Sequence, residues 1–412
     1  RNRYYLALVA VFIAAGVFFL RAPQVAGEKR SGASAVPLST QWDLLSAEYL
    51  QSGSEEMLGQ WLVEQPEEAV SPATPDVRSL HALERKIDRY LAQISGTRTI
   101  PNLSFNIVRE TTPLYEKFTG FDRRSVRSLA SVTKVITSEA VLQLVDRGFL
   151  QLDAPVADYL PEAPFARNPV EDKPITVRHL LQHRSGLPYY NSRGGKSMPS
   201  PQRGLHYFVP NQFRAAGAGF AYSNHNYYTL ALLIETVSGM TFPQYLDQEI
   251  FSRTGMADTR ASSIANGASG VSSNIRDLNL FLAALFLDEA PVRLISTRMR
   301  EEMIAPPENF ENPGPDMMYY GLGIRVQYRD GAPAEIIHTG IWHNCFAEVR
   351  FFPRHRAYLV HLADPPRFRA RRVNEYRWES VRMVTDYLNL VDRVAPDLIS
   401  TDVPAEPPSE VR

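Results

Sequence analysis

The second half of the chain carries a series of short apolar runs that alternate as β-strands do, followed by a long helical pattern from Val373 to Val391. Earlier in the chain, helical spacing over Leu80 to Ile94 precedes an alternating run, Leu103 to Val108. The predicted late strands are Gly321 to Gln327, Glu335 to His338, Phe346 to Phe352 and Tyr358 to Leu362. Strands bordered by helices on both sides predict an α+β fold, in which an antiparallel sheet carries the terminal helices on one face and an inserted helical region completes the domain.

The inserted region is predicted to be mostly helical, because several of its helices have recognisable ends. Val132 to Arg147 is closed by Gly148, and Tyr227 to Ser238 is closed by Gly239. Thr241-Phe242-Pro243-Gln244 has the spacing of a capping box with proline in the first turn, which predicts the start of a further helix.

Composition restricts the classes of function. The 412 residues are 44% hydrophobic, which is enough apolar material for one large domain or two ordinary ones. The formal net charge is -1 and the charges are scattered, so nothing indicates that nucleic acid is a partner. Cys345 is the single cysteine, which excludes an intramolecular disulfide and a cysteine-based metal cluster.

The first residues differ from the rest of the chain. Tyr4 to Leu20 is an uninterrupted apolar stretch with Arg1 and Arg3 before it and Arg21 after it, at the short limit for a membrane-spanning helix. We expect residues 1–27 to be a signal peptide or an N-terminal membrane anchor, 28–78 an acidic Ser/Pro-rich linker, 79–392 the folded domain and 393–412 a Pro-rich tail. The protein is thus expected to be exported to the periplasm or cell surface and held at the membrane by its N-terminal helix; cleavage of that segment stays open.

A motif at the start of a predicted helix indicates a nucleophile. Ser131-Val132-Thr133-Lys134 places a hydroxyl and an amine three residues apart, which are neighbours on one helical face. A partly desolvated lysine can take the proton of the serine, which an arginine cannot do. By itself, the motif fits an ordinary helix start with a solvated lysine better than a catalytic pair.

Two later motifs supply the other groups that acyl transfer needs. Tyr222 offers a phenol that can pass a proton to the leaving group, and Asn224 offers an amide to hold a substrate carbonyl. His338-Thr339-Gly340 lies on a predicted strand whose backbone can pair with an extended substrate. The amide of Ile341 can then join that of Ser131 as an oxyanion hole. Taken singly, Tyr222 fits a packed aromatic and Asn224 a helix cap, so their order relative to Ser131 carries the hypothesis.

The order and context of these motifs resemble the serine β-lactamase and penicillin-binding DD-peptidase superfamily. The resemblance is greatest to its class C β-lactamase-like branch, which includes esterases, D-amino-acid peptidases and carboxypeptidases, and it covers roughly Leu80 to Val391. Besides the three motifs, the segments that carry it are Leu144 to Gly148, Leu152 to Val156, Ile175 to Pro188, Phe220 to Asn224 and Tyr320 to Gly323.

The resemblance implies a role for each site residue. Ser131 would be acylated, and Lys134 and Tyr222 would share the general base and acid work. The residues implied to lie along the substrate are Asn224, His338, Thr339, Gly340 and, through its amide, Ile341. His338 stands where β-lactamases of this branch usually carry lysine, at a position associated with the carboxylate of the substrate. Esterases and peptidases of the family often carry histidine there, so this difference makes a β-lactamase activity less favoured.

Other residues fit structural roles. His179 and His183 lie four apart on a predicted helix without the acidic residue of a metalloprotease motif, and we interpret both as structural. Cys345 is interpreted as a small buried hydrophobe. The long loop that includes Tyr189 and Phe208 is expected either to cover the pocket or to cover the core.

The leading hypothesis is an exported serine hydrolase that forms an acyl-enzyme on Ser131 and hydrolyses an ester or small amide without a metal or organic cofactor. Two alternatives stay open. One is a D-alanyl-D-alanine carboxypeptidase or β-lactamase acting on a peptidoglycan-type substrate or a β-lactam. The other is a catalytically silent binding or scaffold protein with the same fold, since the bulky segment from Ile341 to Phe346 puts access to the pocket in question. The sequence does not predict an oligomeric state.

Overall fold

The computed structural model describes residues 75–94, 102–163, 173–187, 214–308, 310, 316–329, 331–342, 345–364 and 383–393. The predicted N-terminal segment, most of the predicted linker and nearly all of the predicted tail lie outside these residues. So does the loop that includes Tyr189 and Phe208. Within the described ranges, no helix combines the length and the apolar character needed to cross a membrane.

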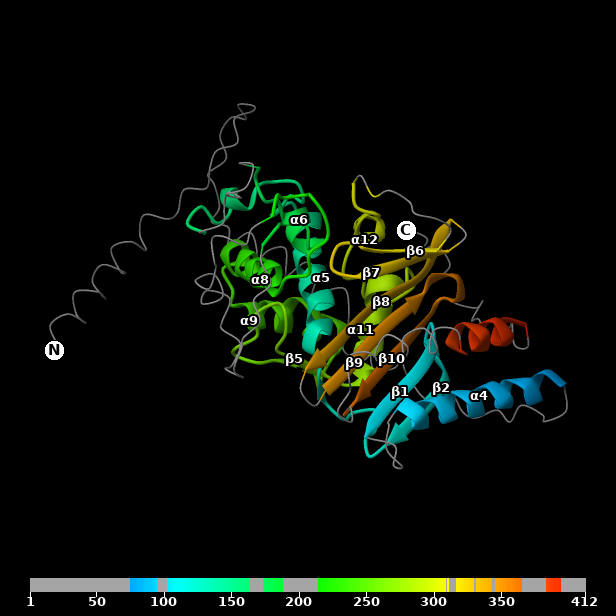
Figure 1. The fold of residues 1–412 in the computed structure, drawn as a ribbon. Helices are drawn as coiled ribbons and strands as arrows, with labels where there is room; N and C mark the ends of the chain where they lie inside the picture. Colours follow the sequence, from blue (N-terminus) through cyan, green and yellow to red (C-terminus); the bar gives the residue numbers. More distant parts are fainter. Residues whose placement is uncertain are drawn as a thin grey trace, which may run out of the picture. The chain divides into compact units, whose positions relative to one another are not determined.

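An antiparallel sheet of seven strands forms the centre of the described domain, in the order β2-β1-β10-β9-β8-β7-β6 (Figure 1). The strands are β1 (Leu103–Arg109), β2 (Thr112–Thr119), β6 (Asp316–Tyr320), β7 (Arg325–Arg329), β8 (Ala332–Trp342), β9 (Cys345–Phe352) and β10 (Ala357–Ala363). Since β1 pairs with β10, the two ends of the domain meet in one sheet, as the predicted fold class requires.

Two features of the sheet differ from the prediction. Residues 321–324 form the turn between β6 and β7 instead of starting a strand, and Gly323 there has a φ of +87°, which favours glycine. The strands β2 and β6, which the sequence analysis did not predict, form the two edges of the sheet. β2 contains Pro113 and is partly exposed along its whole length, so its residues show no clean alternation of buried and exposed positions.

The terminal helices share one apolar cluster with the sheet, which confirms that part of the prediction. α4 (Pro75–Ile94) contributes Ile87 to this cluster, the helical residues 383–393 contribute Tyr387, and β1 contributes Phe105. α4 begins at Pro75, inside the predicted linker, because proline is well tolerated in the first turn, where its missing N–H costs no hydrogen bond. Figure 1 shows α4 lying alongside β1 and β2.

The inserted helical region packs through a second, larger apolar cluster. α11 (Ile275–Phe286) contacts β1, β9 and β10, and the ring of Phe286 stacks on that of Phe351 with centroids 4.7 Å apart. The other helices are α5 (Thr133–Asp146), α6 (Val177–Leu181), α8 (Asn224–Ser238), α9 (Phe242–Leu246), α10 (Ser252–Thr254) and α12 (Thr297–Ile304). A π-helical turn, Asp247–Phe251, joins α9 to α10, and a small sheet has the order β3-β5-β4, with β3 (Arg127–Ser128), β4 (Arg260–Ala261) and β5 (Val271–Ser273).

The helix ends agree closely with the sequence patterns. α5 differs from its predicted bounds by one residue at each end, and the predicted capping box between Thr241 and Gln244 is present at the start of α9. α8 ends at Gly239, which has a φ of +74°, but it begins at Asn224, before the predicted Tyr227. Because α8 begins at Asn224, Tyr222 lies just before the amino end of this buried helix.

Candidate active site

Ser131 lies at the point where the chain enters α5. A 3-10 turn over Ala130–Val132 precedes the helix, and the Val132 amide donates to the carbonyl of Leu129 at 2.9 Å. Ala130 has a φ of +44°, a left-handed conformation that carries a steric cost for a residue with a Cβ. The turn leaves the Ser131 side chain half-buried at the amino end of a helix, where partial positive charge favours an attacking or departing oxygen.

Lys134 is completely buried and lies beside the serine. Its Nζ is 3.2 Å from Ser131 Oγ and donates to the backbone carbonyl of Ala268 at 3.0 Å. Burial is the main cause of a lowered pKa for Lys134, and the positive charge of Arg325 lowers it further, while the charge of Tyr222 and a hydrogen bond to it oppose that shift. A lysine so placed loses its proton more readily than one in water and can act as a base toward Ser131.

Tyr222 also lies at this amine. Its ring centroid is 5.0 Å from Lys134 Nζ, and the ring of Tyr227 is 5.5 Å from the same atom. The ring of His183 lies 4.3 Å from that of Tyr222. The structure therefore brings Ser131, Lys134 and Tyr222 together, although Tyr222 comes from a different part of the chain.

The cap of α8 is Ser223 and not Asn224, so the structural alternative for Asn224, a helix cap, does not apply. The Ser223 hydroxyl accepts a hydrogen bond from the His225 amide at 3.3 Å, while Asn224 is the first helical residue and is half-buried. Among the described residues, no hydrogen bond to the Asn224 side chain is found. The side-chain amide of Asn224 is thus on the first turn of α8, two residues after Tyr222.

Gly340 allows β8 to lie directly against the nucleophile turn. A Cβ at this position would be 2.1 Å from the carbonyl oxygen of Leu129 and 2.8 Å from the Ser131 nitrogen. Both distances are far below van der Waals contact, so any side chain would push the strand away from Ser131. The sequence motif therefore has a steric reason for its glycine, and Ile341 is the next residue of β8.

His338 is buried on β8 and makes hydrogen bonds through both ring nitrogens. Its Nδ1 lies 3.0 Å from the carbonyl oxygen of Thr339, which can only accept, so Nδ1 carries a proton. Its Nε2 lies 3.0 Å from the Tyr320 hydroxyl. Thr339 is opposite Glu348 in the register of β8 and β9, whereas His338 is opposite Val349. His338 and Thr339 therefore project to opposite faces of the sheet.

The bulky segment after Gly340 divides into two parts. Ile341 and Trp342 at the end of β8 are 44% and 46% exposed, so their side chains do not fill the core. Residues 343–344 lie outside the described part of the chain, and Cys345 and Phe346 are buried at the start of β9. Burial raises the pKa of the Cys345 thiol, which agrees with the interpretation of this residue as a buried hydrophobe.

Sequence reasoning missed Arg325, the first residue of β7. It is half-buried and is paired with Tyr320 on one side and Ile337 on the other. Its positive charge lowers the pKa of Lys134 and that of His183, so it acts on the site electrostatically. Within the described residues, no hydrogen bond or ion pair holds its guanidinium. An isolated arginine on a strand carries no signal in the sequence, and only the register of the sheet reveals its position.

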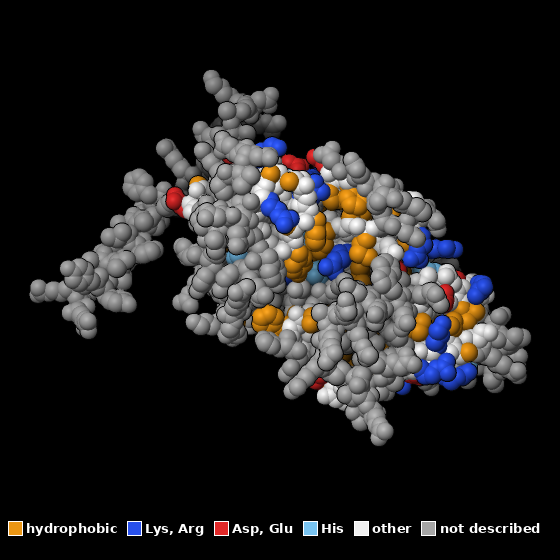
Figure 2. Space-filling model, in the orientation of Figure 1, with side chains coloured by type: hydrophobic (Ala, Val, Ile, Leu, Met, Phe, Trp, Pro, Cys, Tyr) orange, Lys and Arg blue, Asp and Glu red, His pale blue; other side chains and the backbone are white. Residues whose placement is uncertain are grey.

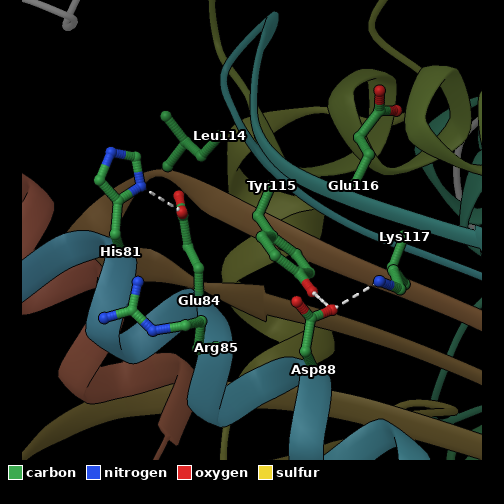
Figure 3. Close-up of a pocket in the computed structure, with 8 residues that line it drawn as sticks. All are labelled: His81, Glu84, Arg85, Asp88, Leu114, Tyr115, Glu116 and Lys117. Atoms are coloured by element: carbon green, nitrogen blue, oxygen red, sulfur yellow. Dashed lines mark hydrogen bonds and ion pairs between the residues drawn. The ribbon is translucent and has the colours of Figure 1, made fainter.

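A pocket of about 430 Å³ lies elsewhere, between α4 and β2, and shares no lining residue with this cluster (Figure 3). Most of its charged groups have partners: His81 pairs with Glu84 at 2.9 Å, and Asp88 pairs with both Lys117 and the Tyr115 hydroxyl at 2.8 Å. Glu116 pairs with Arg123, which does not line the pocket.

Comparisons with known proteins identify the family of the chain. Residues 87–379 match the sequence model of the Beta-lactamase family. The chain is 31% identical over 150 residues to penicillin-binding protein 4* of Bacillus subtilis, covering 33% of this chain and 30% of that protein. It is 34% identical over 142 residues to the D-alanyl-D-alanine-carboxypeptidase/endopeptidase AmpH of Escherichia coli, covering 33% of this chain and 36% of that protein. It is 36% identical over 135 residues to esterase EstB of Burkholderia gladioli, covering 30% and 34%. The matched segments thus span about a third of these relatives.

Solved structures share the fold. The octameric penicillin-binding protein homologue from Pyrococcus abyssi has a TM-score of 0.60 at 20% identity, covering 76% of this chain and 77% of that one. The D-amino acid amidase from Ochrobactrum anthropi, complexed with D-phenylalanine, has a TM-score of 0.59 at 22% identity, covering 75% and 99%. The family match covers well over half of the chain, and the mixed helical and antiparallel architecture agrees with it, so the chain belongs to the Beta-lactamase family.

Proposed function

We propose that this protein is a serine hydrolase that forms an acyl-enzyme on Ser131 and hydrolyses an ester or a small amide. The observation that carries the proposal is the buried amine of Lys134, 3.2 Å from Ser131 Oγ and shifted toward its neutral form. A silent scaffold has no need to bury a lysine, since burying a charged group lowers stability.

The first half of the reaction makes the acyl-enzyme. Ser131 Oγ attacks the substrate carbonyl and its proton passes to Lys134 Nζ as the new C–O bond forms. The backbone amides of Ser131 and Ile341 donate hydrogen bonds to the developing oxyanion, and Asn224 holds a polar group of the substrate. When the bond to the leaving group breaks, Tyr222 donates its proton to the leaving oxygen or nitrogen and regains one from Lys134.

The second half releases the acyl group to water. A water molecule attacks the acyl carbon and gives its proton to the same pair of basic groups, Lys134 and Tyr222. The C–Oγ bond then breaks, Ser131 regains its proton, and the carboxylic acid leaves. No cofactor takes part in either half of this scheme.

The groups around the serine favour a substrate with an uncharged, apolar acyl part. Three large hydrophobic side chains near the motifs are exposed: Phe220 at 51%, with Ile341 and Trp342. Hydrophobic side chains also gather in the middle of the face shown in Figure 2, next to basic ones. Since both nitrogens of His338 are already hydrogen-bonded, this residue does not offer a free cation to a substrate carboxylate. EstB of Burkholderia gladioli, which is 36% identical over 135 residues, is named as an esterase.

Arg325 favours a second candidate function, that of a D-alanyl-D-alanine carboxypeptidase. It is a half-buried cation that acts on Lys134, and a peptide substrate ends in a carboxylate that such a cation would bind. The relative AmpH is named as a carboxypeptidase of this class. A β-lactam also carries a carboxylate and is therefore tested beside the peptide.

Export and membrane anchoring belong to the same proposal. They rest on the apolar stretch from Tyr4 to Leu20 and its flanking arginines. Fractionation of cells that express the full chain tests this part: we expect it in the membrane fraction and accessible to protease from outside the cytoplasm. Recovery in the soluble cytoplasmic fraction would contradict it.

Covalent labelling tests the chemistry. The purified protein and its Ser131→Ala variant are treated with a fluorophosphonate, and the adduct is located by mass spectrometry. We expect an adduct on Ser131 of the wild-type protein and none on the variant. Folded wild-type protein without an adduct would favour the silent binding protein.

Turnover then separates the substrates. A short-chain ester, a chromogenic cephalosporin and a D-Ala-D-Ala peptide are compared under the same conditions. Preferential cleavage of the ester supports the leading proposal. If the peptide alone is cleaved, and Arg325→Gln raises its KM, the carboxypeptidase is the function.

A further inference from the structure

His183 lies directly behind the Tyr222 ring, in the segment that follows α6. It is completely buried and has a φ of +55°, a left-handed conformation that is costly for a residue with a large side chain. The sequence analysis interpreted it together with His179 as structural. The contacts of the two histidines differ, because His179 accepts a hydrogen bond from the Thr176 amide at the start of α6 and His183 reaches the active-site loop.

Two hydrogen bonds join His183 to the residues on either side of Tyr222, and a third joins it to Asn226 in α8. Its backbone carbonyl accepts from the Ala221 amide at 2.8 Å. Its Nδ1 accepts from the Ser223 amide at 3.1 Å and from the Asn226 side chain at 2.8 Å. A backbone N–H can only donate, so Nδ1 is unprotonated and His183 carries its proton on Nε2. The residues before and after Tyr222 are thus held by one side chain and its own backbone.

The ring of His183 adds a packing contact to these bonds. Its centroid lies 4.3 Å from that of Tyr222, 4.9 Å from that of Tyr320 and 5.1 Å from that of Tyr227. Its Nε2 has no hydrogen-bond partner among the described residues. Burying a polar N–H without a partner costs stability, so an apolar ring would pack here at lower cost if packing were the whole role.

The surroundings keep the imidazole neutral. Burial lowers the pKa of His183 well below its usual value, and the charges of Lys134 on α5, His338 on β8 and Arg325 on β7 act in the same direction. The other titratable groups that face it are the phenols of Tyr222, Tyr227 and Tyr320. A protonated Nδ1 would lose both bonds that it accepts, so the arrangement requires the neutral form.

We infer that His183 is a positioning residue, whose Nδ1 acceptor holds the Tyr222 phenol beside Lys134. This inference rests on the proposed function, since it concerns the group assigned to pass the proton to the leaving atom. A displacement of about 1 Å at a reacting group costs on the order of 10²-fold in rate. His183 therefore acts on the rate through Tyr222, without contact with the substrate.

Two substitutions separate the acceptor from the ring. His183→Asn places an oxygen acceptor near the position of Nδ1 and tolerates a left-handed backbone, so it keeps the bonds and loses the ring. His183→Phe keeps a ring against Tyr222 and loses the acceptor. We expect His183→Phe to lower kcat by on the order of 10²-fold with little change in KM, and His183→Asn to keep kcat within a few-fold of the wild type. The pH dependence of kcat should change in His183→Phe and stay as in the wild type in His183→Asn.

His179→Gln provides the matched control for stability. It disturbs the cap of α6 close by, and we expect lower thermal stability with an unchanged kcat and pH profile. Folded His183→Phe with the kcat and pH profile of the wild type would overturn the inference, as would a His183→Asn variant impaired as severely as His183→Phe. If His183→Phe does not fold, Asn226→Leu carries the test by removing one donor to Nδ1: lowered kcat at unchanged thermal midpoint supports the inference, and wild-type kcat overturns it.

A spectroscopic readout makes the result independent of the proposed function. Tyrosine labelled with ¹³C at Cζ gives a resonance for Tyr222 that is assigned with Tyr222→Phe. We expect its position and its pH titration to change in His183→Phe and to be kept in His183→Asn. If Ser131 is never labelled by fluorophosphonate but this resonance responds as expected, the proposed function fails and the positioning role stands. An unchanged resonance in an active His183→Phe variant overturns the positioning role alone.

Discussion

Lys134 and Glu139 lie on the same helix, α5, and neither exposes any surface to solvent. Burial disfavours the charged form of both: the pKa of Lys134 is lowered and that of Glu139 is raised to about 8. Their partners differ. The Lys134 amine contacts Ser131 Oγ and the Ala268 carbonyl. In contrast, neither carboxyl oxygen of Glu139 has a hydrogen bond of normal distance and angle to another described residue.

The two sites show that the same physical cost leads to different results. Around Lys134, the neutral form that burial favours is a base placed at a nucleophile. Around Glu139, Arg253, Arg147 and Gln143 oppose the rise in pKa without overcoming burial, and no reacting group is near. The helix therefore carries one buried titratable group that serves the proposed reaction and one that only lowers stability. Each of the following predictions tests one side of this difference.

Removing the amine should have the largest effect. We expect Lys134→Met to lower kcat/KM by about 10³-fold or more, because the base is lost. The thermal midpoint should stay unchanged or rise, since an apolar side chain of similar length replaces a buried polar one. Ester hydrolysis and a thermal melt measure both quantities. Lys117→Met, which removes a surface amine paired with Asp88, is the control and should change neither quantity much. A Lys134→Met variant that keeps a tenth of the activity would contradict the role of base.

Removing the phenol should have the next largest effect on rate. We expect Tyr222→Phe to lower kcat by about 10²-fold, since proton transfer to the leaving atom is lost while the ring still packs on His183. Tyr222 raises the pKa of Lys134, so its removal lowers that pKa further and the rise of kcat/KM with pH moves to lower pH. A pH profile from about pH 5 to 9 checks the direction. A shift to higher pH would show that Tyr222 and Lys134 do not interact as the structure indicates.

Glu139→Gln should change stability and leave the reaction alone. In the wild type, the unfolded chain ionises Glu139 near its ordinary pKa of 4.5, while the folded chain holds the proton to about 8, so stability is lost as pH rises between these values. We expect the glutamine variant to gain about 1–3 kcal/mol at neutral pH and to lose this pH dependence. Urea unfolding at several pH values measures it, with kcat as the control. A variant that is less stable at neutral pH would show that the carboxyl has a partner that it needs.

The sequence predicted the parts of the site that depend on local spacing. The interval between Ser131 and Lys134 places both on one helical turn, and the order of motifs pointed to Tyr222, which the structure brings to the same amine. Glycine at 340 also has a local signature, although its steric reason appears only when β8 is seen against Leu129. For the same reason the helix ends, which depend on caps and glycines, were predicted to within a few residues.

The parts that the sequence did not reveal depend on contacts between distant segments. Arg325 reaches the site only through the pairing of β6, β7 and β8, and the partners of His183, which are Ser223 and Asn226, lie far along the chain from it. The burial of Glu139 gives no sequence signal, since a glutamate in a helix is ordinarily exposed. The edge strands β2 and β6 were missed because an edge strand is buried less regularly than a central one.

Neutralising Arg325 should have the smallest effect on activity. It tests most directly which groups set the pKa of Lys134. The positive charge of Arg325 lowers the pKa of Lys134, so Arg325→Gln should raise that pKa and move the rise of kcat/KM to higher pH, by less than about one unit for a charge that is only half-buried. Ester turnover well above the new pKa should return to the wild-type rate. Arg329→Gln, at the other end of β7, is the control and should leave the profile in place. A profile that does not move in Arg325→Gln would mean that burial and Tyr222 set the basicity of Lys134 without Arg325, and Lys134 and Glu139 would then differ only in the groups that they contact.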